Sequence, residues 1–194
     1  LPKMEAGKLG FKEGPMAAIV ELIEISITGP GGHTSRPAET VDLIWAMSQL
    51  VLSIEQSVKR STDQQEPVVL AFGKVVGGNT FNVLPDSIEL KGTLRYLNSN
   101  LKDRLHNSID KAILGVEQVT GAQIKWSVPY TSPGVFNDKE LTDLLIKSSS
   151  NAIGDKNTII LEESSMGGED FAYYLERIPG SYYRIGCYDS CAND

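Results

Sequence analysis

Histidine and cysteine are scarce in this sequence of 194 residues, which contains only His33, His106, Cys187 and Cys191 as residues of these two types. Two histidines far apart in the chain cannot supply the several ligands of a zinc centre, and two thiols without a nearby histidine are a weak sign of one. We therefore expect no metal bound by this chain alone and two unpaired thiols. His106 lies in a polar stretch of a predicted helix and is expected on the surface.

Long apolar runs and clustered positive charge are also missing. No run approaches the roughly 18 to 20 apolar residues that cross a bilayer, and the N-terminus has no signal-peptide pattern. The net charge of −7, without clusters of Lys and Arg, argues against binding to nucleic acid. With 41% hydrophobic and 22% charged residues, the composition is that of an ordinary globular protein. We expect a cytoplasmic protein whose partner is a small molecule or a second copy of itself.

The first two thirds of the chain alternate between strand and helix patterns. Alternating residues predict strands, and apolar residues at helical spacing predict helices. Along residues 19–28, Glu21 shares one side with four isoleucines. The expected elements are strands at 19–28, 68–76, 86–96 and 124–130, and helices at 40–58 and 101–116. This β-α-β-β-α-β order predicts an α+β, ferredoxin-like domain with both helices on one face of an antiparallel sheet.

The strand after Pro85 has an apolar side and a polar side. Because successive side chains point to opposite faces of a sheet, one set faces the core and the other faces the side without helices. The core set is Ile88, Leu90, Leu94 and Tyr96, and the opposite set is Glu89, Lys91, Thr93 and Arg95. Arg95 is therefore expected on the open face, either binding a ligand or pairing with an acid such as Glu89.

Residues 132–194 have a different pattern: a helix at 138–153, a strand at 158–161, a short helix from Glu169 and a strand at 182–186. A parallel β-α-β unit of this size has too few helices to cover both faces of its sheet, so we expect it to be part of a larger α/β layer. The first twenty residues are assigned to the same layer. The expected domains are thus 1–20 and 132–194 from a partial α/β catalytic domain, with 21–131 between them.

Three glycine-containing segments carry candidate site residues. In Gly-Gly-His33 between a strand and a helix, backbone amides and an imidazole suit an oxyanion or a carboxylate, although an exposed loop histidine is an alternative. The turn before Val-Leu-Pro presents Asn82, which either orients a substrate or belongs to an ordinary turn. In Met-Gly-Gly168-Glu169-Asp, the glycine amides could bind an anion and Glu169 could contact substrate, or the acids could cap a helix.

Taken together, the segments GPGGHTSRP, NTFNVLPDSIELKGTLR and MGGEDFAYYLERIPGSYYRIG resemble the M20 metallopeptidase family. The third segment is similar to its amidohydrolase branch of hippurate hydrolases, aminoacylases and auxin-conjugate hydrolases. The resemblance runs from Leu1 to about Gly186. It implies an α/β catalytic domain that binds two divalent metals, zinc or manganese, and a ferredoxin-like lid at 21–131 that forms a homodimer.

The resemblance also implies roles for single residues. His33 would reach the partner subunit's site and stabilise the tetrahedral oxyanion, Asn82 would contact the substrate, and Arg95 would bind its carboxylate. The substrate would be an N-acyl amino acid, whose amide carbonyl is attacked by a metal-bound water that a glutamate activates.

The family's metal ligands and catalytic glutamate have no counterpart in these 194 residues. We therefore expect a fragment of a hydrolase that is inactive alone. The alternative is a non-catalytic ferredoxin-like module for ligand binding or dimerisation, which leaves residues 133–194 unexplained.

Overall fold

The computed structural model describes residues 4–188, which form two compact units. Unit 2 comprises residues 20–131, and unit 1 combines residues 1–19 with residues 132–194. Unit 2 is therefore continuous in sequence, and unit 1 is assembled from the two segments that flank it.

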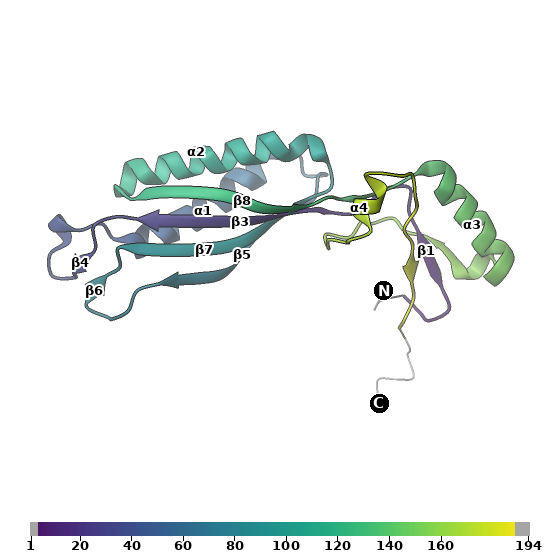
Figure 1. The fold of residues 1–194 in the computed structure, drawn as a ribbon, viewed down its shortest axis with the longest axis horizontal. Helices are drawn as coiled ribbons and strands as arrows, with labels where there is room; N and C mark the ends of the chain where they lie inside the picture. The colour runs from purple at the N-terminus through teal and green to yellow at the C-terminus, as the bar shows by residue number, and fades with distance from the viewer. Residues whose placement is uncertain (1–3, 189–194) are drawn as a thin grey trace, which may run out of the picture. The chain divides into compact units, whose positions relative to one another are not determined.

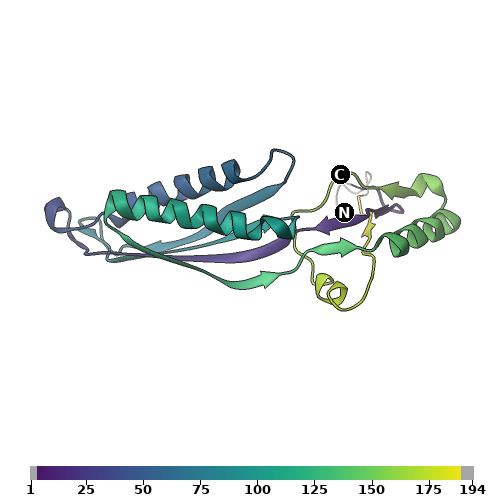
Figure 2. The ribbon, with the colours of Figure 1, turned by 90° about the horizontal axis from the view of Figure 1, so that it is seen from above.

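Unit 2 is a four-stranded sheet with two long helices over one of its faces (Figures 1 and 2). The strand order is β5-β7-β3-β8. β5 and β7 are antiparallel, with a register shift between Phe72 and Lys74. The elements in chain order are β3 (Ile19–Thr28), α1 (Leu43–Ser61), β5 (Val68–Gly77), β7 (Ser87–Tyr96), α2 (Lys102–Thr120) and β8 (Gln123–Ser132).

Local chemistry fixes the ends of the two helices. The Asp42 carboxylate accepts hydrogen bonds from the backbone N–H groups of Ile44, at 3.1 Å, and Trp45, at 3.0 Å, and so caps the start of α1. α2 ends at Gly121, whose φ of 76° is the left-handed conformation in which glycine is favoured. Both helices bury one apolar stripe, which in α1 consists of Leu43, Ala46, Leu50, Ile54 and Val58.

A polar network lies inside the core of unit 2, around the fully buried Glu21. The Tyr96 hydroxyl donates to Glu21 Oε1 at 3.0 Å, and His106 Nε2 lies 2.6 Å from Oε2. The ammonium of Lys102 is 3.7 Å from Oε1. The prediction of a surface position for His106 was wrong, because this histidine faces the sheet from α2 and contacts the buried carboxyl group there.

Two further elements of unit 2 lie beyond the end of β7 at which Ser87 is located. β4 (Gly32–His33) pairs antiparallel with β6 (Val83–Leu84). Neither strand was predicted, because two residues are too few to show an alternating pattern. Three 3₁₀ turns also occur in the described residues: η1 (Pro37–Glu39) and η2 (Ser99–Leu101) in unit 2, and η3 (Asp155–Asn157) in unit 1.

Unit 1 contains a three-stranded sheet in which strands from both ends of the chain meet. β1 (Leu9–Phe11) lies between β10 (Thr158–Ile160), to which it is parallel, and β11 (Arg184–Ile185), to which it is antiparallel. The expectation of a parallel β-α-β unit within residues 132–194 was therefore wrong. β10 and β11 do not pair with each other, and the N-terminal β1 separates them.

The rest of unit 1 is a second strand pair and two helices. β2 (Gly14–Ala17) pairs antiparallel with β9 (Val135–Asn137), and α3 (Lys139–Ile153) and α4 (Ala172–Leu175) complete the unit. A small core forms from Met16, Ala17, Val135 and Ala172. Across residues 4–188, no helix combines the length and the apolar character needed to span a membrane.

Candidate functional site

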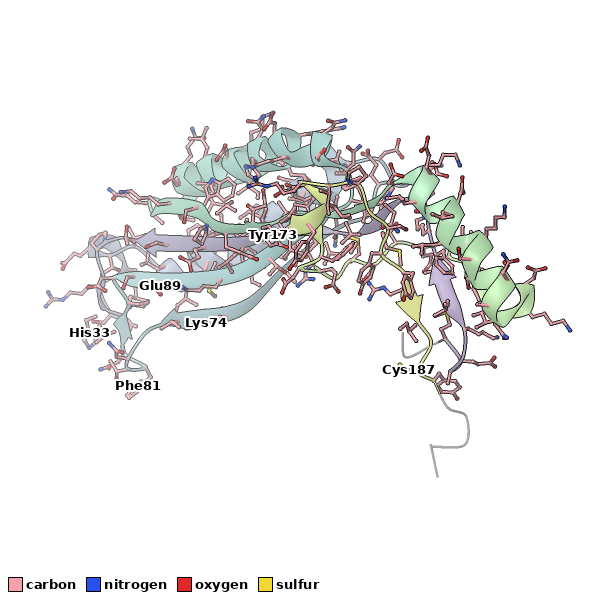
Figure 3. The ribbon with its side chains drawn as sticks, turned by 45° about the vertical axis from the view of Figure 1, so that its right-hand side comes forward. His33, Lys74, Phe81, Glu89, Tyr173 and Cys187 are labelled. Atoms are coloured by element: carbon pink, nitrogen blue, oxygen red, sulfur yellow. The ribbon has the colours of Figure 1, made fainter. Side chains whose placement is uncertain are left out.

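His33 lies at the tip of unit 2, on the strand pair β4 and β6 (Figure 3). It pairs in register with Val83, and the backbone N–H of Thr34 donates to the Asn82 carbonyl at 3.1 Å. The structure therefore brings the His33 and Asn82 segments together, although they are far apart in the sequence. The His33 side chain is exposed, so a ligand can reach it.

The hydrogen bonds of His33 determine which ring nitrogen carries the proton. The backbone N–H of Ser35 donates to His33 Nδ1 at 3.2 Å, and the Ser35 hydroxyl lies 2.8 Å from the same atom. Because Nδ1 accepts a hydrogen bond, the proton of the neutral ring is on Nε2. His33 can therefore donate a hydrogen bond from Nε2, as an oxyanion contact requires.

Thr80 and Val83, close to Asn82 in the sequence, border a cavity of about 560 Å³ whose lining does not include Asn82 itself. Thr80 Oγ1 donates to Asn82 Oδ1 at 3.2 Å, which fixes the amide orientation and leaves its NH₂ group as the donor end. Backbone from Gly31, Gly32, Gly77 and Gly78 lines part of the cavity. Phe81, which the sequence reasoning did not single out, is 95% exposed at the same tip (Figure 3).

Arg95 lies on β7, on the face of the sheet opposite the buried residues. The predicted core set Ile88, Leu90, Leu94 and Tyr96 is buried, which confirms the predicted alternation. The Arg95 Nε donates to Thr93 Oγ1 at 3.3 Å. The alternative pairing with Glu89 fails on geometry, because six positions along a strand separate the two residues by about 20 Å.

Arg95 is also far from the tip that carries His33. Ser87, where β7 begins near the tip, is eight positions before Arg95. At about 3.3 Å per residue, Arg95 is roughly 26 Å further along the strand. One chain of this protein therefore holds His33 and Asn82 together at one end of unit 2 and Arg95 towards the other.

Glu169, in unit 1, has a specific hydrogen-bond partner. The hydroxyl of Tyr182 donates to Glu169 Oε2 at 2.9 Å. Burial, followed by this hydrogen bond, raises the pKa of Tyr182, and the nearby Arg184 acts in the opposite direction. Tyr182 was not predicted as a site residue, and no sequence signal distinguishes it from the adjacent Tyr183.

The prediction that the short helix starts at Glu169 was wrong. α4 begins at Ala172, whose backbone N–H donates to the backbone carbonyl of Glu169 at 3.1 Å, and no side chain caps the helix. Helix capping therefore does not account for the Glu169 carboxylate. In the preceding glycine pair, the Gly167 N–H donates to Ser165 Oγ at 3.1 Å, and Gly168 is exposed.

Residues 4–188 do not fit a two-metal centre. Within the described part of the chain, no three side chains of His, Cys, Asp or Glu come close enough to hold a metal ion. His33 and His106 belong to the tip and to the buried network, respectively. Cys187 is exposed, and Cys191 lies outside the described residues, so the expectation of two unpaired thiols stays a prediction.

Comparison with known proteins identifies the family of this chain. An N-acetyl-L-cysteine deacetylase of Bacillus subtilis is 34% identical over 189 residues, which cover 95% of this chain and 44% of the relative. The IAA-amino acid hydrolase ILR1-like 2 of Arabidopsis thaliana is 34% identical over 185 residues, covering 94% and 42%. This chain spans less than half the length of either relative.

A solved structure agrees with these relatives. It is a Bacillus subtilis protein described as a dinuclear metal binding peptidase of the M20 family, with a TM-score of 0.74 and 28% identity over 96% of this chain and 46% of that chain. The sequence model of peptidase family M20/M25/M40 matches residues 2–194. The chain therefore belongs to peptidase family M20/M25/M40, as the resemblance of its three segments implied.

Proposed function

We propose that this chain is part of a longer metal-dependent amidohydrolase that cleaves the amide bond of N-acyl amino acids. The observation that carries the proposal is membership of the M20 family over residues 2–194, together with relatives named for hydrolysing an N-acetyl amino acid and an amino acid conjugate. The length of these relatives supports the view that these 194 residues act as part of a larger protein.

Unit 2 is assigned to the ferredoxin-like lid, and unit 1 to part of the α/β catalytic domain. The β-α-β-β-α-β element order, the central position of β7 and β3, and helices on one face of the sheet support the first assignment. The mixed three-stranded sheet of unit 1, with only two helices, supports the second. A non-catalytic ferredoxin-like module is less well supported, because the family match extends through both units.

In this proposal the chain contributes contacts to the substrate. His33 donates from Nε2 to the oxyanion that forms at the attacked carbonyl, and Asn82 orients the substrate beside it. Arg95 binds the substrate carboxylate, for which its planar guanidinium is suited. Gly168 and Glu169 provide further polar contacts from unit 1.

Two divalent metal ions, zinc or manganese, belong to the proposed longer enzyme, in keeping with the solved relative that is described as dinuclear. They would supply an activated water and polarise the carbonyl. Residues 4–188 bring together no group of side chains that could hold such an ion, so in this proposal the ligands come from other parts of the longer protein.

The separation of His33 from Arg95 supports a homodimer with shared sites. Only three bonds connect the attacked carbonyl carbon of an N-acyl amino acid to its carboxylate carbon, whereas His33 and Arg95 of one chain lie tens of ångströms apart by the strand geometry. One substrate can contact both residues only if they come from different subunits. A two-fold dimer would form two such sites, each with one subunit's His33 and the partner's Arg95.

The test is complementation between two inactive variants of the longer enzyme, His33→Ala and Arg95→Ala, with hydrolysis of an N-acetyl amino acid as the readout. Each variant alone should lose about 10²-fold or more in kcat/KM. Randomly mixed subunits should regain roughly a quarter of the wild-type activity, because half of the dimers contain both variants and one of their two sites is intact.

As the control, each variant is taken through the same subunit-exchange procedure alone, and those samples should regain no hydrolytic activity. A substrate with an amidated carboxyl group reports on Arg95 separately, because it lacks the carboxylate that Arg95 would bind. The Arg95→Ala variant should lose much less kcat/KM on this substrate than on the free acid. If the mixed dimers stay inactive, the shared site is wrong. If the wild-type enzyme hydrolyses no N-acyl amino acid, the proposed function itself is wrong.

A further inference from the structure

The Glu169 carboxylate is held by one oxygen. Tyr182 donates to Oε2 at 2.9 Å, whereas Oε1 has no hydrogen-bond partner among the described residues. The carboxylate is half-buried, so this arrangement fixes its orientation and leaves one acceptor for a ligand. An ionised carboxylate accepts hydrogen bonds and cannot donate them, so the ligand group must be a donor.

Tyr182 is itself fixed by an amide clamp on its backbone. Asn137, which is 5% exposed, accepts from the Tyr182 N–H at 2.7 Å and donates to the Tyr182 carbonyl at 2.8 Å. The same Asn137 NH₂ group donates to the Lys12 carbonyl at 2.8 Å. Side-chain hydrogen bonds thus tie Tyr182, two residues before β11, to the end of β9 and to the N-terminal segment.

The ring of Tyr182 is held from two sides as well. Its centroid lies 5.7 Å from that of Phe171, and the Arg184 guanidinium carbon is 5.3 Å from the ring centroid. The direction of the phenol therefore depends on packing and on the backbone clamp, and not only on its bond to Glu169. Because the pKa of Tyr182 is raised, the hydroxyl keeps its proton and remains a donor throughout the neutral range.

We propose that Tyr182 is a positioning residue that orients Glu169 to accept the N–H of the substrate's scissile amide. This inference rests on the proposed function, and the chemistry of that substrate class selects the ligand group. Apart from derivatives of proline, whose acylated nitrogen carries no hydrogen, ionised N-acyl amino acids share one hydrogen-bond donor, the amide N–H. Glu169 matches that donor, just as Arg95 matches the carboxylate.

The experiment compares Tyr182→Phe with the control Tyr183→Phe in the longer enzyme. Tyr182→Phe removes one hydroxyl and keeps the ring contacts with Phe171 and Arg184. For an N-acetyl amino acid it should lower kcat/KM about five- to tenfold, the usual effect of losing one hydrogen bond, mainly through a higher KM. Tyr183, whose ring packs on Phe11, should tolerate the same change with less than a twofold effect.

Two further measurements separate positioning from a purely structural effect. On the N-methylated form of the same substrate, which lacks the N–H, Tyr182→Phe should have less than a twofold effect. In a Glu169→Gln background, Tyr182→Phe should cause little additional loss, because coupled residues are not additive. Thermal melting of every variant checks that the fold is retained.

Equal losses on the N–H and N-methyl substrates, or fully additive losses with Glu169→Gln, would overturn the inference while leaving the proposed function intact. A wild-type enzyme that is inactive on all N-acyl amino acids would instead remove the proposed function on which the inference rests. The two failures are therefore distinguishable in one series of measurements.

Discussion

At the scale of single residues, Glu21 shows how a carboxyl group is tolerated in the core of unit 2. Burying an unpartnered carboxyl group costs several kcal/mol, and hydrogen bonds offset this cost. Tyr96 and His106 contact its two oxygens, and Lys102 lies nearby on the same helix as His106. Within residues 4–188, no buried side-chain N or O atom is left without a hydrogen bond. The network thus ties α2 to β3 and β7.

Tyr96 makes the stability of the protein sensitive to alkaline pH. Burial, followed by the charge of Glu21 and the hydrogen bond to it, raises the pKa of Tyr96. The unfolded chain loses this proton near pH 10, before the folded chain does. Stability contributed by Tyr96 is therefore fully present below about pH 10 and is lost as the pH rises above that value.

We predict that Tyr96→Phe lowers the free energy of unfolding at pH 7 by about 1 to 3 kcal/mol, because Glu21 loses a hydrogen-bond donor. The same variant should lose less stability than the wild type between about pH 9 and pH 11. Urea unfolding at several pH values measures both effects. Parallel pH profiles for the two proteins would contradict the assignment of the alkaline sensitivity to Tyr96.

Single residues also show what the sequence could reveal. The face of β7 on which Arg95 lies could be predicted from the sequence, because side chains along a strand alternate between its two faces. The partners of Glu21 and Glu169 did not follow, since Tyr96, His106 and Tyr182 reach them from distant parts of the chain. The roles of His33, Asn82, Gly168 and Glu169 in substrate binding stay predictions.

At the scale of single elements, α2 contains two glycines in opposite situations. Gly115 is exposed inside the helix, and a Cβ atom added there meets no atom within 4 Å. Gly121 ends the helix with a φ of +76°, a conformation that L-residues adopt at a cost. The same substitution should therefore have opposite effects at two sites six residues apart.

We predict that Gly115→Ala raises the free energy of unfolding by about 0.5 to 1 kcal/mol and that Gly121→Ala lowers it by about 1 kcal/mol. Each variant is the matched control for the other, because both add one methyl group to the same helix. Thermal or urea unfolding measures the difference. A loss of stability with Gly115→Ala would show that the helix interior is more crowded than the structure indicates.

The long elements were the predictable ones. Strands at 19–28 and 68–76 and helices near 40–58, 101–116 and 138–153 were expected within a few residues of their observed bounds, because each repeats its pattern several times. β1, β2, β4, β6 and β9 were missed, since two to four residues cannot show a period. Their existence depends on partners elsewhere in the chain, as with β4 and β6.

At the scale of the whole molecule, unit 2 should be able to fold alone. It is continuous in sequence and has its own buried core on β3, β7 and both helices. Its two ends enter and leave through β3 and β8, which are neighbours in the sheet. Unit 1, in contrast, draws its core from both ends of the chain, as Met16 and Val135 show.

We predict that a fragment of residues 19–132 unfolds cooperatively as an independent domain, with the circular dichroism of mixed helix and sheet. A shorter fragment of residues 19–96, which lacks α2 and β8, is the control and should be unfolded, because the core face of the sheet loses half of its cover. Urea titrations of both fragments measure the difference. A non-cooperative transition in residues 19–132 would show that unit 2 depends on unit 1.

The assembly of unit 1 from both ends of the chain also determines the order of events on the ribosome. The strands that flank β1 are made long after it, because β10 follows β1 by about 150 residues and β11 follows it by about 175. At bacterial and eukaryotic elongation rates this wait is roughly 10 to 30 s. Unit 2 is complete well before then. We therefore expect nascent chains in which unit 2 is folded while both edges of β1 are still unpaired, because β10 and β11 have not yet been made. Chaperones that bind extended apolar segments would therefore meet residues 9–17 before residues 132–194 of unit 1 exist.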